Sequence, residues 1–169
     1  MNRLASFALA AASIAACFIA CPTHAQSKDE QAIRALEDRF AAAFRAKDLD
    51  AIMKVYAPGD GIFVFDVMTP RQYAGYDAYK KDWASLFDQA KGPIQFDISD
   101  LVIESDGKLA YSHSIQHVAY AMKDGTHSES VVRVTDVYRK IGGQWLVIHE
   151  HVSVPIDPAT GKPDMMSKP

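Results

Sequence analysis

Cysteine is scarce in this sequence, and its scarcity limits the kinds of cross-link, nucleophile and metal site that the protein can have. The chain of 169 residues has two cysteines, Cys17 and Cys21, and both lie in the first 25 residues. If that segment is removed from the mature protein, no disulfide, thiol nucleophile or thiolate metal site remains. We therefore expect no metal site, and no motif in the sequence indicates another cofactor.

Two further absences exclude classes of partner. After Ala20 no apolar run is long enough to span a membrane. Residues 26–169 carry 17 basic residues, the 18 of the chain minus Arg3, against 21 acidic ones, so their net charge is −4 with histidine neutral. Without a basic stripe, nucleic acid is excluded as a partner.

The first 25 residues have the pattern of a secretory signal peptide. Arg3 precedes an apolar run, Leu4–Ala20, and small residues end the segment at Thr23-His24-Ala25. We predict cleavage after Ala25, which leaves 144 residues (169 − 25) in a periplasmic or secreted protein. The alternative is lipoprotein processing, because Ile14-Ala15-Ala16-Cys17 resembles a lipobox and would place a lipid anchor at Cys17.

Residues 26–157 predict a single α+β domain. Helical spacing and caps predict a helix after Ser27, a short one after Asp48 or Asp50, and one over Asp77–Ala90. Composition and turn pairs predict strands at 62–66, 94–104, 109–122, 126–140 and 144–154. One strongly curved antiparallel sheet would fold over the three helices as a cone with a pocket between sheet and helices. Residues 158–169 are predicted to be an irregular tail.

The Asp124-Gly125 turn sets which polar side chains face one another. As a two-residue loop it pairs Lys123 with Thr126, and His113 then lies opposite Asp136. Paired side chains of adjacent strands interact directly. The same register puts a set of neighbouring polar residues on the face of Asp136: Tyr111, His117 and Tyr138.

The last strand has two alternative registers. If Gly142-Gly143 is a two-residue loop, Asp136 pairs with His149, and His151 shares its face. If the loop has three residues, Asp136 pairs with Ile148, Glu150 faces inward, and both histidines point outward, where they would pack on a partner subunit. The His-x-His pair could also join His113 or His117 in a zinc site, but the spacing is not diagnostic and no metal ligand is predicted.

Several segments together resemble a known family. DLDAIMKVYAPGDGIFVFD (48–66), the Gly75 turn, VTDVYRK (134–140) and GGQWLVIHEHVSVP (142–155) resemble the SnoaL-like, ketosteroid-isomerase-like branch of the nuclear transport factor 2-like superfamily. The resemblance covers Asp29 to about Asp157 and implies the cone-shaped, cystatin-like fold. It does not imply one activity, because this fold hosts unrelated functions.

The resemblance also suggests roles for residues. Ketosteroid isomerase uses an aspartate base and an oxyanion hole of a tyrosine and a protonated aspartic acid. The resemblance implies Asp66 as the base and Asp136 as the acid. The tyrosine of the family's first helix corresponds to Phe40 here, which removes one oxyanion donor. The resemblance also favours the three-residue loop before the last strand, with Glu150 inside.

Two classes of function follow. The first is a cofactor-independent isomerase, dehydratase or cyclase that uses carboxylate acid–base chemistry on a small apolar, hydroxylated or carbonyl compound. The second is a non-catalytic ligand-binding or interaction module, and in either class we expect a homodimer through the outer face of the sheet. The candidate catalytic residues are Asp66, Asp136 and His113. The candidate ligand-binding residues are Tyr56, Trp83, Tyr111, His117, Tyr138, Glu150, His149 and His151.

Overall fold

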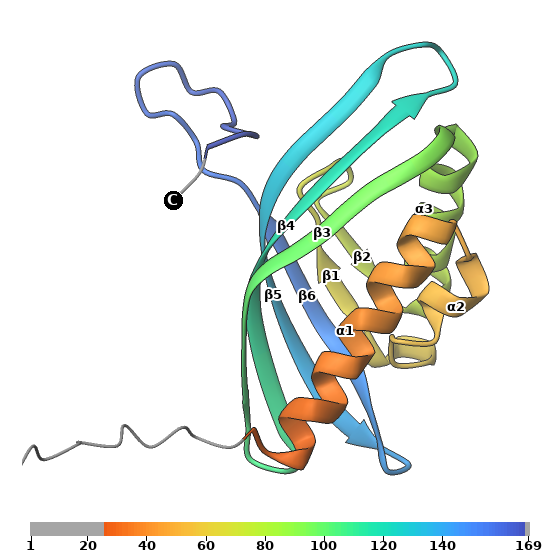
Figure 1. The fold of residues 1–169 in the computed structure, drawn as a ribbon, viewed down its shortest axis with the longest axis vertical. Helices are drawn as coiled ribbons and strands as arrows, with labels where there is room; N and C mark the ends of the chain where they lie inside the picture. Colours follow the sequence, from red (N-terminus) through yellow and green to blue (C-terminus); the bar gives the residue numbers. More distant parts are fainter. Residues whose placement is uncertain (1–25, 168–169) are drawn as a thin grey trace, which may run out of the picture.

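The computed structural model describes residues 26–167, so the predicted signal peptide (1–25) and the alternative lipid anchor at Cys17 lie outside the described residues. The described chain forms three α-helices, a short 3-10 helix and a six-stranded sheet (Figure 1). In chain order the elements are α1 (Lys28–Ala46), α2 (Leu49–Met53), η1 (Gly59–Gly61), β1 (Phe63–Phe65), β2 (Gln72–Ala74), α3 (Tyr76–Gln89), β3 (Ala90–Ser105), β4 (Leu109–Met122), β5 (His127–Ile141) and β6 (Gln144–Ser153).

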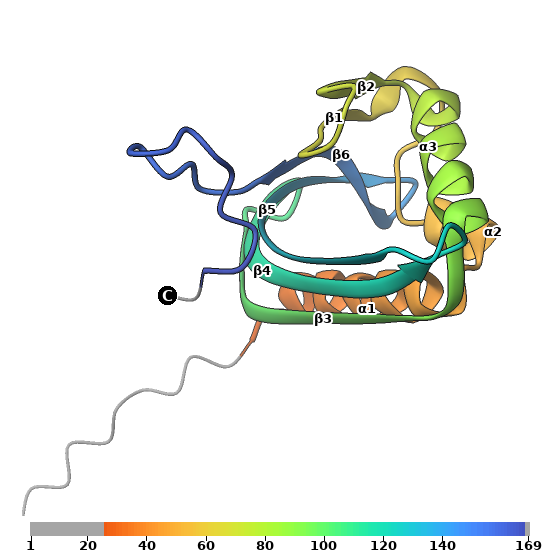
Figure 2. The same cartoon turned by 90° about the horizontal axis from the view of Figure 1, so that it is seen from above.

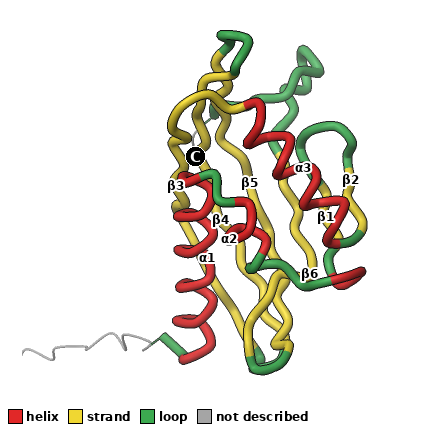
Figure 3. Tube along the Cα trace, turned by 90° about the vertical axis from the view of Figure 1, so that its right-hand side faces the viewer, coloured by secondary structure: helices red, strands yellow, loops and turns green. Residues whose placement is uncertain are grey.

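The sheet is curved and open, with the strand order β2-β1-β6-β5-β4-β3. Its longest pairs, β3–β4, β4–β5 and β5–β6, are antiparallel hairpin neighbours. Seen from above, the sheet bends round so that β1 and β2 lie across the interior from β3 and β4 (Figure 2). The helices lie on the inner side, in front of the strands in Figure 3. The predicted α+β cone is therefore confirmed.

The sheet differs from the prediction in two details. The short strand β2 was not predicted, and it pairs antiparallel with β1 through Val64 and Tyr73. On its other side β1 pairs in parallel with β6, and Val64 lies beside Glu150. The sheet is therefore mixed, and the parallel pair brings the end of β1 next to the C-terminal part of the last strand.

Helix α1 begins and ends where its sequence directs. Ser27 accepts a hydrogen bond from the Glu30 amide, and the Glu30 side chain accepts one from the Ser27 amide, which completes the predicted capping box. At the other end Lys47 adopts a left-handed conformation that stops the helix. The helix packs mainly on β3 and buries an apolar stripe that consists of Ile33, Leu36, Phe40, Ala41, Ala43 and Phe44.

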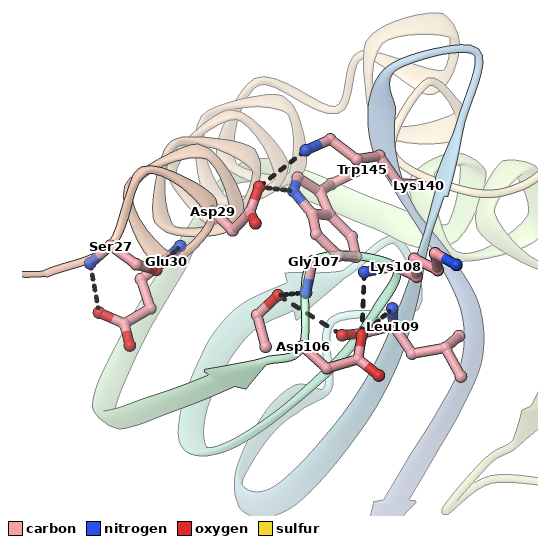
Figure 4. A network of polar contacts seen from close by, with 10 residues as sticks. Ser27, Asp29, Glu30, Asp106, Gly107, Lys108, Leu109, Lys140 and Trp145 are labelled. Atoms are coloured by element: carbon pink, nitrogen blue, oxygen red, sulfur yellow. Dashed lines mark hydrogen bonds and ion pairs between the residues drawn. The ribbon is translucent and has the colours of Figure 1, made fainter.

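The first turn of α1 is anchored to the β5–β6 hairpin. Asp29 Oδ1 accepts hydrogen bonds from Lys140 Nζ at 2.9 Å and from the indole nitrogen of Trp145 at 3.0 Å (Figure 4). The hydrogen bond from Lys140 keeps the pKa of Asp29 below its usual range. The nearby β3–β4 turn is closed by Asp106, whose carboxylate accepts from the Lys108 and Leu109 amides.

The predicted register between β4 and β5 is wrong by one residue. The turn has three residues, Lys123 to Gly125, because the Met122 amide donates to the Thr126 carbonyl. Asp136 therefore pairs with Ser112, and His113 pairs with Thr135. Because side chains alternate across a strand, a one-residue shift moves every β4 side chain to the other face. The β5 residues keep the predicted inner face.

The last hairpin combines features of both alternatives. Gly142-Gly143 is a two-residue loop, and both glycines have positive φ, as such a turn requires. A β-bulge then inserts Ile148 between the pairs Tyr138–Val147 and Val137–His149. The bulge shifts the pairing by one residue, so that Asp136 lies opposite Glu150. The loop favoured by the resemblance is wrong, but the inward position of Glu150 is right.

Candidate functional site

A cavity of about 360 Å³ lies between the helices and the inner face of the sheet. Such a volume falls in the range that holds small organic ligands. Its walls come from α1, α3, β3 to β6 and the loop after β1. Most of the side chains that line it are apolar or aromatic, among them Phe40, Phe44, Trp83, Leu86, Phe96, Val118, Val132 and Val152.

Glu150 is the carboxyl group at the centre of the site. It is buried on β6, and both of its oxygens accept hydrogen bonds from tyrosine hydroxyls, Oε1 from Tyr79 and Oε2 from Tyr56 at 3.1 Å. Burial and, to a smaller extent, the charge of Asp66 raise the pKa of Glu150 to about 7, while the two tyrosine hydrogen bonds oppose the rise. Glu150 therefore changes protonation near neutral pH, where a general acid or base is most effective.

Asp136 belongs to a second group of polar side chains under the cavity. The Tyr138 hydroxyl donates to Glu37 Oε1 at 2.8 Å and lies 2.7 Å from Ser112 Oγ and 3.5 Å from Asp136 Oδ2. Asp136 Oδ1 has no hydrogen-bond partner among residues 26–167. Burial, followed by the charges of Glu37 and Glu150, raises the pKa of Asp136 well above its usual range.

Glu37 reaches this group from α1 and is almost completely buried. Burial raises its pKa to about 7, and the hydrogen bond from Tyr138 opposes that rise. Among the described residues no lysine, arginine or histidine side chain forms an ion pair with Glu37, Asp136 or Glu150. Without a countercharge, three carboxyl groups this close together retain protons up to near-neutral pH.

Two polar residues connect the two parts of the site. Glu150 and Gln116 line both the large cavity and a void of about 10 Å³ beside Asp136. The void is too small for an organic ligand. Gln116 is buried on the inner face of β4, and its carboxamide makes no hydrogen bond to any described side chain or backbone group. It therefore has a free donor at the cavity wall.

Asp66 lies at the end of β1, as predicted, and lines the large cavity. Its Oδ1 accepts a hydrogen bond from the Met68 amide at 3.0 Å. Burial raises its pKa, and the hydrogen bond from Met68 partly opposes the rise. Asp66 and Glu150 thus share the large cavity, whereas Asp136 lies beside the small void.

The structure separates the predicted site residues into two sets. Tyr56, Trp83, Tyr138 and Glu150 are buried inside with Asp136. Five residues lie on the outer face of the sheet: Tyr111, His113, His117, His149 and His151. The one-residue shift explains the three on β4, and the bulge explains the two on β6. His113 is exposed and does not meet Asp136, so the proposed pairing of these two residues is wrong.

The outward histidines have other neighbours. His117 Nε2 lies 2.8 Å from Glu129 Oε1. His149 Nδ1 lies 2.8 Å from the Phe63 carbonyl, and its ring is stacked on Phe63. Within residues 26–167 no group of three or more histidine, cysteine, aspartate or glutamate side chains is arranged to hold a metal ion.

Three residues of the site were missed from the sequence. Glu37 lies on the apolar face of its helix, four residues after Ile33 and three before Phe40, and that position for an acid was a usable signal. Tyr79 lies one helical turn before Trp83 and shares its buried face. Gln116 was assigned to the wrong face by the shifted register and left no independent signal.

The comparisons with known proteins agree with this architecture. The family model described as a SnoaL-like domain matches residues 33–157, which is more than half of the chain. The chain belongs to the SnoaL-like family. No curated protein matches this SnoaL-like chain. Among its described helices, none is long and apolar enough to cross a membrane.

Solved structures similar to this SnoaL-like domain have nuclear transport factor 2-like folds. An NTF2-like protein of unknown function from Pseudomonas putida KT2440 is 35% identical, with a TM-score of 0.74 over 83% of this chain and 96% of that chain. A ketosteroid isomerase-like protein from Erwinia carotovora atroseptica SCRI1043 is 18% identical, with a TM-score of 0.64 over 76% and 97%. An NTF2-like superfamily protein from Salmonella enterica serovar Typhimurium LT2 is 15% identical, with a TM-score of 0.69 over 79% and 96%.

Phe40 has a particular place in this SnoaL-like domain. It lines both the cavity and the void, and it has no hydroxyl to offer where the resemblance implies a tyrosine. Its ring packs edge-on against Tyr56 at a centroid distance of 6.4 Å. The hydroxyls that bind Glu150 therefore come from Tyr56, after α2, and from Tyr79 on α3.

Proposed function

We propose that this SnoaL-like domain is a cofactor-independent enzyme that moves a proton on a small, mostly apolar carbonyl or hydroxyl compound. The observation that carries the proposal is Glu150, a buried carboxyl with a pKa of about 7 on the wall of a ligand-sized cavity. A base with such a pKa is half ionised near pH 7 and still basic enough to accept a proton. Tyr56 and Tyr79 hold it in place through both oxygens.

In the proposed reaction the ionised Glu150 removes a proton next to a carbonyl group of the substrate. Negative charge develops on the carbonyl oxygen and requires a donor that is already in position. The free carboxamide of Gln116, which lies on the same cavity wall, is suited to donate to that oxygen. Glu150, which holds the proton after the first step, is suited to return it to another carbon of the substrate, and this regenerates the ionised base. Asp66 lines the same cavity, and its charge raises the pKa of Glu150.

This assignment changes the roles expected from the sequence. Glu150 takes the place that was expected for Asp66, and Gln116 replaces His113 as the partner of the oxyanion. Asp136 acts indirectly: its charge, if formed, would add to that of its neighbours Glu37 and Glu150, and its raised pKa keeps it protonated instead. A protonated Asp136 lets Glu150 ionise near neutral pH.

The cavity favours uncharged compounds. Its lining includes Asp66, Asp82 and Glu150 but no lysine, arginine or histidine among the described residues. An anionic ligand would lose its hydration without gaining a countercharge, which is costly inside a protein. The proposed substrate is therefore a neutral molecule with an aromatic or aliphatic body and at least one oxygen.

The test is hydrogen exchange at the carbon next to a carbonyl. A panel of small neutral ketones in D2O is followed by proton NMR with the wild-type protein, Glu150→Gln and the control Glu104→Gln, which changes an exposed carboxylate on β3. We expect exchange to be accelerated by the wild type and the control, and the acceleration to fall by roughly 100-fold or more in Glu150→Gln. Binding without any acceleration would instead identify a non-catalytic ligand-binding module, and unchanged exchange in Glu150→Gln would remove Glu150 from the mechanism.

We further propose that the protein forms a homodimer through the outer face of its sheet. Phe65 and Tyr111 are about 40% exposed there, and the rings of Phe63, Phe65, His149 and His151 form an aromatic cluster on the same face. An exposed apolar face of this kind favours association with a partner surface. Light scattering of the wild type and of Phe65→Glu is the test, and a monomeric wild type would refute the dimer.

Export is the remaining part of the proposal. It is supported by the charged start, apolar run and small-residue ending of residues 1–25. N-terminal sequencing of the protein recovered from the periplasm of a bacterial host should begin at Gln26. Recovery of the chain from the cytoplasm with its original N-terminus would contradict it.

A further inference from the structure

The edge of β5 that pairs with β6 continues past the end of β6. The last pair between the two strands joins Arg133 to Ser153, so the β5 residues before Arg133 have no β6 partner. One of them nevertheless has a backbone partner, because the Val131 amide donates to the Met165 carbonyl at 2.7 Å. A segment near the C-terminus therefore continues the sheet edge where β6 leaves it.

That segment, which we call the C-terminal strap, consists of residues 155–166 and is held by its own hydrogen bonds. It leaves the end of β6 and folds back beside the sheet (Figure 1). The Asp164 amide donates to the Pro155 carbonyl at 2.8 Å, and Ile156 forms a bridge with Pro163. Asp157 closes the turn by accepting from the Ala159 amide and the Thr160 hydroxyl. The predicted irregular tail is thus a folded turn that closes on itself.

The strap places one side chain against the ligand cavity. Met165 lines it together with Val132 and Val152, whereas the next residue, Met166, is 48% exposed. The family match ends at residue 157, so Met165 lies outside the part of the chain that the family model describes. Methionine is flexible and adapts its shape to a neighbouring surface.

We propose that Met165 is a specificity-determining residue and that the C-terminal strap is part of the ligand-binding site. The size of the side chain at position 165 sets how large a molecule this end of the cavity accepts. The proposal rests on the large cavity as the binding site of the proposed function, but it does not depend on proton transfer.

The experiment compares two neutral fluorescent probes of different size, N-phenyl-1-naphthylamine and the larger Nile red. The measured quantity is the ratio of their dissociation constants for the full chain and for Met165→Ala, Met165→Trp and the matched control Met166→Trp. We expect Met165→Ala to shift the ratio at least fivefold in favour of Nile red and Met165→Trp to shift it at least fivefold the other way. Met166→Trp should change it less than twofold.

A second measurement follows the docking of the strap. The Val131 amide should be protected from hydrogen exchange in the wild type and lose that protection when the chain is shortened after Asp157. The proposal would be overturned if the Met165 variants left the probe ratio unchanged, or if Met166→Trp changed it as much as they do. It would also be overturned if the Val131 amide of the wild type were unprotected. If Glu150→Gln loses the exchange activity but the Met165 variants leave the probe ratio unchanged, the proposed function stands and only the role of Met165 is removed.

Discussion

Tyr79 and Glu150 lie 71 residues apart in the sequence and share a buried hydrogen bond that joins α3 to β6. The tyrosine hydroxyl favours the ionised form of the carboxyl, whereas burial favours the protonated form. The balance of these two effects gives the carboxyl a pKa of about 7. The position of a helix on the sheet thus tunes a titrating group.

Removal of the Tyr79 hydroxyl should raise the pKa of Glu150 further. In Tyr79→Phe the ionised carboxylate loses a donor, so its titration moves to higher pH. NMR titration of the side-chain carboxyl carbons in protein labelled at glutamate would measure the shift. Tyr73→Phe is the control, because the Tyr73 hydroxyl donates to Asp82 instead. A titration of Glu150 that stays in place, or moves to lower pH, would show that the hydrogen bond does not tune it.

Stability should fall as the pH rises toward neutrality. The pKa of Glu37 is about 7 in the folded protein and about 4.5 in the unfolded chain, so between these values the folded state binds more protons. The free energy of unfolding therefore decreases with rising pH in that window, by up to about 1.4 kcal/mol per pH unit for one such group. Glu150 acts in the same direction.

Glu37→Gln tests this pH dependence. The glutamine oxygen still accepts the hydrogen bond from Tyr138, but the residue no longer titrates. We expect the variant to match the wild type near pH 5 and to exceed its unfolding free energy at pH 8 by about 1 kcal/mol or more, as measured by urea unfolding. A wild type that becomes more stable from pH 5 to pH 8 would contradict the buried, protonated state of these carboxyls.

Ligand charge should decide affinity in the cavity. Three compounds of nearly equal shape, 2-naphthalenemethanol, 2-naphthylmethylammonium and 2-naphthoate, separate charge from size. Because the described lining has acids but no basic side chain, we expect naphthoate to bind at least tenfold more weakly than the alcohol. Calorimetry would measure this, and Asp66→Asn should reduce the penalty on naphthoate. Naphthoate that binds as tightly as the alcohol would show that a countercharge is present.

The two faces of β4 should respond differently to mutation. His113 is exposed on the outer face and Gln116 is buried on the inner face at the cavity. His113→Ala should leave ketone hydrogen exchange and the melting temperature unchanged. Gln116→Leu should lower the exchange rate by about 100-fold if its amide stabilises the oxyanion. A strong effect of His113→Ala would restore the register that the structure contradicts.

The fold was predictable because its signals are local and redundant. The Ser27–Glu30 capping box, the helical spacing after it and the Gly142-Gly143 turn each specify an element without help from the rest of the chain. The resemblance added the arrangement of those elements. Only features with weak local signals were missed, such as the three-residue strand β2 and the turn of the C-terminal strap.

The site was less predictable because one residue more or less in a turn or a bulge decides which face of the sheet each side chain lies on. One extra residue in the Lys123–Gly125 turn reversed the faces of β4, and no feature of Asp124-Gly125 distinguishes a two-residue loop from a three-residue one. The bulge at Ile148 has no signature that could be separated from an ordinary strand. Asp66 could be located because it directly follows a strand. Asp136 could be located because the β5 residues keep the predicted inner face.

The bulge at Ile148 decides which side chains of the last strand face the interior. If Ile148 paired with Val137 in place of forming the bulge, the pairing set by the glycine turn would run on without interruption, and His149 would lie opposite Asp136. Two imidazoles would then enter the interior and the glutamate would leave it. The chain therefore carries a second set of ionisable groups on the reverse of the same strand, and whether Ile148 is paired or bulged decides whether carboxylates or imidazoles face the interior.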